Sequence, residues 1–159
     1  SLKMNSLSDR KMIDKLYEAS RAGVKIKLIV RGICSLIPGV KGMSENIEAI
    51  SIVDNYLEHS RIYIFGNDGN TEVFISSADF MTRNLDGRVE VTCPIYQKDI
   101  KKELIETFEI SWKANVKARL QNENLTNVYR KLNGEKPFRA QLEMYNYFRN
   151  KIDVVVEKI

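Results

Sequence analysis

The order of hydrophobic and polar positions along the 159 residues predicts strands that alternate with helices. Residues 24–30 alternate and then become continuously apolar, which is the pattern of a strand that enters the middle of a sheet. Residues 61–65 and 71–76 are rich in Ile, Tyr, Phe and Val, and the Gly-Asn-Asp-Gly-Asn cluster between them predicts a tight hairpin. Two further strands are predicted at residues 46–54 and 88–95.

The first helix is predicted from its capping residues. Ser6 would be the N-cap, in a capping box with Asp9, and the helix would run to about Ala22 with Gly23 as its stop. Its apolar residues recur at helical spacing and predict a buried stripe. The stripe consists of Met12, Ile13, Leu16, Tyr17 and Ala19.

Two more helices are predicted in the second half of the chain. One begins at Asp99 and carries an apolar core stripe, and the last begins with Pro137 in its first turn. The polar segment 116–134 between them is expected to be a long surface loop, and no element is predicted for residues 153–159. The stripe residues are Ile100, Leu104, Phe108 and Trp112 in the first of these helices, and Phe138, Leu142, Tyr145 and Ile152 in the last.

Composition narrows the class of protein but not its partner. A chain of this length suits one α/β domain over residues 1–159, and no apolar run approaches the ~20 residues of a membrane span. The net charge of +4 favours anionic partners such as nucleotides, polyphosphate or nucleic acid, although a solvated basic surface explains it equally well. Cys34 and Cys93 are predicted to be reduced thiols of a cytoplasmic protein, and the single histidine argues against a structural zinc site.

Four residues are candidates for an anion-binding site. Lys3 and Asn5 would lie beside the N-terminus of the first helix, where free N–H groups favour negative charge. Arg31 directly follows the central strand, at the end where open α/β sheets usually bind ligands, although an ordinary surface ion pair is an equally good explanation of its position. His59 is the only histidine, and histidine is the side chain that holds or gives a proton near neutral pH.

Five motifs carry a resemblance that covers Lys3 to Phe148. In chain order they are KMNSL, LIVRGIC, PGVKGMSENI, EHSRIYIF and ISSADFMTRNLDGRVEV. They resemble the C-terminal catalytic region of the bacterial polyphosphate kinases that carry phosphate on a histidine, which belong structurally with the phospholipase D superfamily. The resemblance implies a phospholipase D-like mixed β-sheet flanked by α-helices, with a C-terminal helical segment, cut from a longer polypeptide.

The chain departs from the phospholipase D pattern at three positions. That superfamily uses a His-x-Lys pair with a nearby Gly-Ser-x-Asn, and here Arg61 replaces the lysine and Asp79 replaces the asparagine. Gly66 stands where the superfamily has an acidic residue. These departures argue against phosphodiester hydrolysis and agree with the kinase branch.

The resemblance implies a reversible transfer of the terminal phosphate of ATP to polyphosphate through a phosphohistidine in a preceding domain. His59 would then be a second, catalytic histidine, and Arg31 and His59 would bind ATP or ADP and its phosphates. Mg²⁺ would take part, with ligands outside this stretch. Further phosphate-binding candidates are Lys3, Arg61, Arg83 and Asn84.

The resemblance also implies partners and a location. The expected partners are ATP, polyphosphate, the preceding domains of the same polypeptide and further copies in a homo-oligomer, without nucleic acid or a transmembrane segment. The expected location is the cytoplasm, with a peripheral position at the inner membrane left open. Two other functions stay open: a phospholipase D-like phosphodiesterase that pairs two His59 side chains in a homodimer, and a polyanion-binding module without catalysis.

Overall fold

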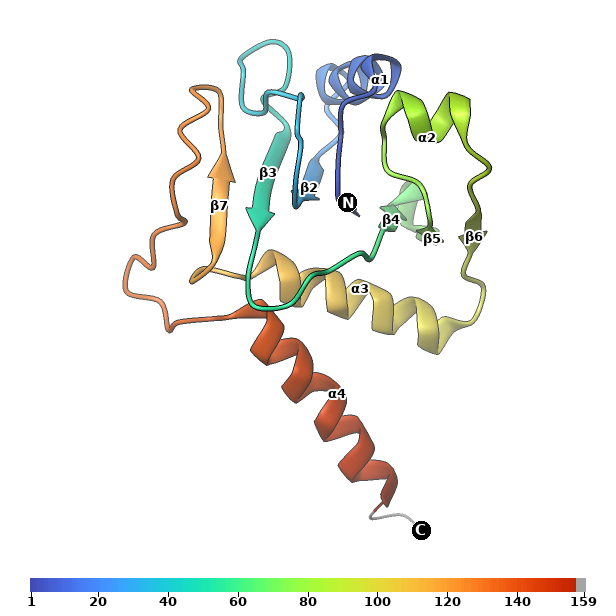
Figure 1. Ribbon diagram of the computed structural model, residues 1–159, viewed down its shortest axis with the longest axis vertical. Coiled ribbons are helices and arrows are strands. Elements are labelled where there is room, and N and C mark those ends of the chain that lie inside the picture. The colour runs from blue at the N-terminus through green and yellow to red at the C-terminus, as the bar shows by residue number, and fades with distance from the viewer. Residues whose placement is uncertain (157–159) are drawn as a thin grey trace.

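The computed structural model describes residues 1–156 of the chain. Seven strands form one mixed sheet in the order β6-β5-β4-β1-β2-β3-β7, and the helices gather at two opposite sides of it (Figure 1). In chain order the elements are β1 (Leu2–Met4), α1 (Arg10–Arg21), β2 (Ile26–Val30), β3 (Ile47–Ile52), β4 (Ile62–Phe65), the 3₁₀ turn Asn67–Gly69, β5 (Glu72–Ser76), α2 (Thr82–Gly87), β6 (Thr92–Pro94), α3 (Lys98–Trp112), β7 (Ala118–Gln121) and α4 (Ala140–Val156).

The centre of the sheet is parallel and both of its flanks are antiparallel. Strands β1, β2 and β3 run side by side in parallel, with Lys3 opposite Ile29 and Ile29 opposite Ile50. The predicted hairpin is present as β4 and β5, and β7 pairs antiparallel with β3. Because parallel strands end at the same edge, the residues that follow β1 and β2 emerge next to one another.

Alternate residues of the central strands enter two different cores. Leu28 and Val30 of β2 join the cluster that α1 covers, and the predicted stripe of α1 packs there. Ile29 points to the opposite face and joins a second cluster with Phe108 and Trp112 of α3. Figure 1 shows α1 and α2 together at the top and α3 and α4 at the bottom.

The prediction that Ser6 caps the first helix is wrong. Helix α1 begins at Arg10, and its N-cap is Asp9, whose side chain accepts a hydrogen bond from the Met12 backbone N–H. Lys3 belongs to the central strand β1, and Asn5 directly follows that strand. Strand β1 is not predicted from the sequence pattern, because it is only three residues long.

The second half of the chain holds more structure than its sequence pattern indicates. The expected loop 116–134 contains β7, and the last helix begins at Ala140 rather than at Pro137. Helix α2 was not predicted, and β6 occupies only the last part of the expected strand 88–95. Within the described residues, no helix is long and apolar enough to cross a membrane.

The predicted apolar stripes of α3 and α4 differ in how far they are buried. Phe108 and Trp112 of α3 are buried as predicted, whereas Ile100 at the start of the helix is exposed. Leu142 and Tyr145 of α4 are also exposed, at 54% and 61%. The face of α4 that carries them is therefore covered only in part by this chain.

Candidate functional site

Arg31 lies where the parallel strands β1 and β2 end, and Asn5 fixes its orientation. The Arg31 Nε donates to the Asn5 side-chain oxygen at 2.9 Å, and the Arg31 backbone N–H donates to the Met4 carbonyl at 3.2 Å. Gly32 allows this approach, because a Cβ there would stand 3.0 Å from the Asn5 carbonyl oxygen. No partner is found within residues 1–156 for the two terminal guanidinium nitrogens of Arg31, so they remain able to donate to an anion.

Asn5 is itself held by a buried carboxylate. Asp79 accepts from the Asn5 backbone N–H at 2.8 Å and binds Arg61 through two hydrogen bonds of 3.1 and 3.2 Å. Burial alone would raise the pKa of Asp79, but the hydrogen bonds from Arg61 and Asn5 and the charge of Arg61 together hold that pKa below its usual range. A continuous set of contacts therefore runs from Arg61 through Asp79 and Asn5 to Arg31.

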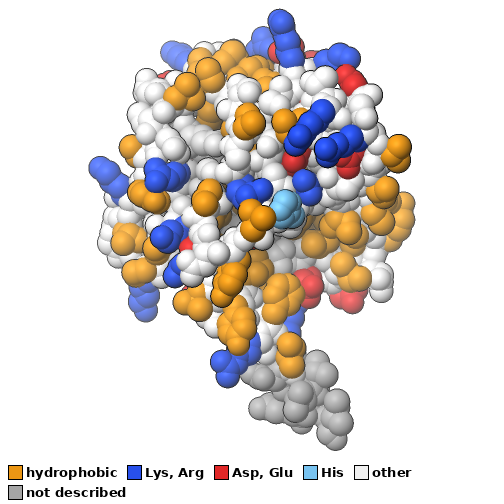
Figure 2. All heavy atoms as spheres, viewed as in Figure 1, with side chains coloured by type: hydrophobic (Ala, Val, Ile, Leu, Met, Phe, Trp, Pro, Cys, Tyr) orange, Lys and Arg blue, Asp and Glu red, His pale blue; other side chains and the backbone are white. Residues whose placement is uncertain are grey.

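His59 lies in the connection between β3 and β4, and its side chain is exposed. The Arg61 guanidinium donates to the His59 carbonyl at 3.0 Å, which fixes the backbone at this point. No hydrogen bond of the imidazole itself is found within the described chain. Figure 2 shows the single histidine at the molecular surface, with Lys and Arg side chains nearby on the same face.

A buried lysine anchors the loop beside His59. Lys3 points to the α3 face, where its ammonium donates to Glu58 at 2.6 Å and to the Ser111 hydroxyl at 3.0 Å. Burial alone would raise the pKa of Glu58, but the charge and hydrogen bond of Lys3, with a further hydrogen bond from Gln141, lower it. Lys3 is thus committed to a structural ion pair in this conformation.

The start of α4 is hydrogen-bonded to the same connection between β3 and β4. Gln141 exchanges hydrogen bonds with the backbone of Tyr56, at 2.9 Å and 2.7 Å, and donates to Glu58 at 3.0 Å. Arg139, just before the helix, binds the Asp54 carboxylate through several hydrogen bonds, the shortest at 2.5 Å. These contacts hold the residues that precede His59 against the start of α4.

A small hollow joins Arg31 to the neighbours of His59. Glu58 and Ser60, on either side of the histidine, line it together with Asn5 and Arg31. Its volume is about 10 Å³, which is the space of a single water probe, so a larger ligand would lie across its mouth. The structure therefore brings Arg31 and the His59 loop to one sheet edge, although His59 itself does not line the hollow.

The remaining candidates, Arg83 and Asn84, lie on α2. Arg83 is exposed, whereas Asn84 is buried and donates to Glu90 at 2.5 Å. Glu90 also accepts from Ser77, which follows β5. These contacts give Asn84 a bracing role beside the hairpin. Neither residue lines the hollow beside Arg31.

Comparison with known proteins gives this arrangement a family. Residues 1–141 match the family described as "Polyphosphate kinase C-terminal domain 2". The chain belongs to this family. It is similar to the polyphosphate kinases of Vibrio vulnificus (48% identity) and Escherichia coli K12 (47% identity), in each case over 94% of this chain and about a fifth of the relative.

A solved relative confirms the predicted fold. The crystal structure of polyphosphate kinase from Porphyromonas gingivalis aligns with a TM-score of 0.93 and 48% sequence identity, over 96% of this chain and 24% of that chain. The mixed sheet with flanking helices and a C-terminal helix is thus that of the polyphosphate kinase C-terminal domain 2. The chain spans only about a fifth of the length of the curated relatives that it matches.

The acidic, histidine and cysteine side chains near the site are dispersed or paired in the part of the chain that the structure describes. Among the described residues there is no group of three or more His, Cys, Asp or Glu side chains that could hold a metal ion. The carboxylates closest to the hollow are already engaged, Glu58 by Lys3 and Asp79 by Arg61.

The sequence did not identify the residues that position the site in that role. Asn5 and Asp79 stand inside quoted motifs, and Asn5 was expected only beside an anion. Gln141 and Ser111 carry no such signal, because their contacts with the site are made with residues that are more than 80 positions away.

Proposed function

We propose that this chain is one domain of a longer polyphosphate kinase, in which Arg31 and His59 bind the phosphates of ATP. The whole enzyme would reversibly transfer the terminal phosphate of ATP to polyphosphate through a phosphohistidine in a preceding domain. Its expected form is a cytoplasmic homo-oligomer, with peripheral membrane association left open. The observation that carries the proposal is the pre-oriented Arg31 guanidinium, which Asn5 holds by one nitrogen at the end of two parallel strands.

The chemistry follows from what each side chain can donate. A transferring phosphoryl group carries negative charge on its equatorial oxygens, and an arginine fork stabilises that charge without movement if it is already in place. An exposed histidine at the same edge can give a proton to the departing oxygen or position it. Mg²⁺ would accompany the nucleotide with ligands outside this chain, and it would neutralise phosphate charge there.

Arg31→Ala should weaken the binding of a non-hydrolysable ATP analogue by about 10- to 100-fold, because a charge-assisted hydrogen bond contributes roughly 1.5–3 kcal/mol. Isothermal titration of the analogue into both proteins measures this. Arg10→Ala is the matched control, since it removes the same charge from a side chain that is 94% exposed on α1. Binding to the wild type should also weaken as salt rises. Equal affinities for wild type and Arg31→Ala would remove Arg31 from the site.

A further inference from the structure

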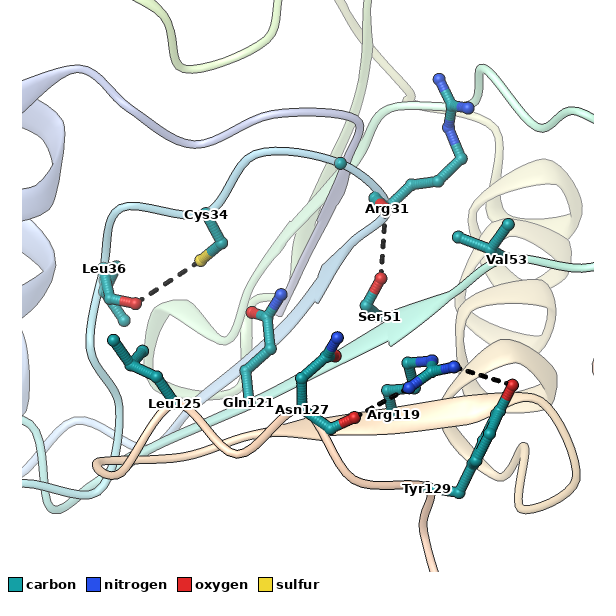
Figure 3. Close-up of a pocket in the computed structure, with 11 residues that line it drawn as sticks. Arg31, Cys34, Leu36, Ser51, Val53, Arg119, Gln121, Leu125, Asn127 and Tyr129 are labelled. Atoms are coloured by element: carbon teal, nitrogen blue, oxygen red, sulfur yellow. Dashed lines mark hydrogen bonds between the residues drawn. The ribbon is translucent and has the colours of Figure 1, made fainter.

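A second concave site lies at the same edge of the sheet, on its other face. Its volume is about 640 Å³, within the range of small-molecule sites. Arg119 and Gln121 of β7 pair with Ser51 and Ala49 of β3, and Ala49 belongs to the core on the α1 face. Arg31 contributes its backbone here, and Figure 3 shows its side chain directed away from the other lining residues.

The guanidinium of Arg119 is held in a fixed position in this pocket. It stacks on the Tyr129 ring at 4.0 Å, donates to the Tyr129 hydroxyl at 2.9 Å and donates to the Asn127 carbonyl at 3.0 Å. Two of its five N–H groups have these partners, which leaves three that can bind an anion. None of the described residues that line the pocket is acidic, so nothing there competes with an anionic ligand.

Two side-chain amides stand beside this guanidinium. Figure 3 shows the amides of Gln121, at the end of β7, and Asn127, in the segment that follows β7, projecting side by side into the space below Cys34 and Ser51. The Gln121 side-chain oxygen is buried and lacks a hydrogen-bond partner among the described residues. A buried acceptor of this kind is costly unless a donor reaches it, and a ligand N–H group would supply one.

We propose that this pocket binds a purine nucleoside monophosphate. Side-chain amides pair with a purine edge because they offer an acceptor for its N–H group and a donor for its ring nitrogen or oxygen. Leu36, Val53 and Leu125 provide apolar walls for the base, and Arg119 binds the phosphate. A long polyphosphate chain is a poorer match, because Arg119 is the one described side chain here that presents a cation to the cavity.

The test is a titration of AMP followed by amide chemical shifts. In the wild-type chain, saturable shifts should centre on residues 119–129 and 34–36. Asn127→Gly removes one amide at a position with φ of 50°, where glycine is unstrained, and Arg119→Lys keeps the charge but loses the planar fork. Each variant should weaken the binding of AMP by about tenfold or more. Arg10→Ala, which removes one positive charge from an exposed side chain of α1 that does not line the pocket, should leave the affinity unchanged.

Four outcomes of the AMP titration would overturn the proposal. They are the absence of saturable shifts, shifts that centre on Asn5 and residues 56–61, loss of binding in Arg10→Ala, and unchanged binding in both pocket variants. Adenosine and inorganic phosphate are titrated separately and should each bind at least tenfold more weakly than AMP. If inorganic phosphate binds as tightly as AMP, the pocket does not recognise the base. If adenosine binds as tightly as AMP, Arg119 does not bind the phosphate. The ATP-analogue titration of Arg31→Ala tests the proposed ATP site and does not depend on the AMP result. The ATP-site proposal and the AMP-pocket proposal can therefore fail separately.

Discussion

His59→Ala in the full-length kinase should lower phosphoryl transfer by about 10²- to 10⁴-fold, the usual loss when general acid or base help is removed. The variant should fold normally, because the side chain is exposed and forms no hydrogen bond with the described residues. The rate of polyphosphate formation from ATP measures the effect, and thermal unfolding checks the fold. Unchanged transfer in a folded His59→Ala protein would exclude His59 from the chemistry.

Two further variants separate the roles that His59 can play. Ser60→Ala alters the exposed neighbour of His59 and should leave transfer close to wild type. His59→Gln keeps an N–H donor but cannot exchange a proton near neutral pH. If His59→Gln transfers phosphate as slowly as His59→Ala, His59 is a proton donor. If His59→Gln recovers part of the wild-type rate, His59 positions the phosphate.

Asp79→Asn should lower the free energy of unfolding at pH 7 by about 3 kcal/mol, because breaking a buried ion pair leaves an uncompensated charge. Only 7% of the Asp79 side chain and 18% of the Arg61 side chain are exposed. Urea unfolding measures the change. Asp14→Asn is the matched control, since its partner Arg10 is almost fully exposed and the loss should stay within about 0.5 kcal/mol.

The same pair predicts how stability depends on pH. The pKa of Asp79 is lower in the folded chain than in the unfolded one, so the folded state binds fewer protons through this group. Its contribution is complete above the ordinary pKa of an aspartate, about 3.9, and is lost as pH falls through the lowered folded value. The stability gap between wild type and Asp79→Asn should therefore narrow at acidic pH. A gap that stays constant would show that the carboxylate charge is not what stabilises this region.

The central strands could be predicted from the sequence because their environment is uniform. Residues 24–30 are predicted as a strand in the middle of a sheet and residues 46–54 as a further strand. Strands β2 and β3 lie inside these ranges and are covered by helices on both faces. The hairpin was predictable from its turn residues, and Asn67 and Asp68 do take positive φ. Strand β1 was not, since three residues carry too little pattern and its middle residue, Lys3, is a buried cation.

The errors at the helix ends and at β7 share a physical cause. Ser6 and Asp9 are both good N-caps, and the choice between them depends on tertiary contacts, because Thr82 of α2 also donates to the Asp9 carboxylate. Strand β7 is polar on the face that lines the pocket, so its sequence looks like a loop. It becomes a strand by pairing with β3, which is a contact between residues about 70 positions apart.

The candidate site was predictable only in its central residues. The positions of Arg31 and His59 follow from the end of a strand and from a family motif. The residues that hold them, Asn5, Asp79 and Gln141, act through hydrogen bonds across the sequence that no local pattern records. Lys3 was expected to bind phosphate, yet in the structure its ammonium is bound to Glu58.

We expect this chain to bind and orient phosphate, while the phosphate-carrying histidine lies in another domain of the kinase. Incubation of the isolated chain with ATP labelled on its terminal phosphate tests this most directly, with the full-length enzyme as the positive control. The chain should remain unlabelled and form no polyphosphate. The full-length enzyme should take up the label and form polyphosphate. Acid-labile label on the isolated chain that disappears in His59→Ala would make His59 itself the carrier and would contradict the account.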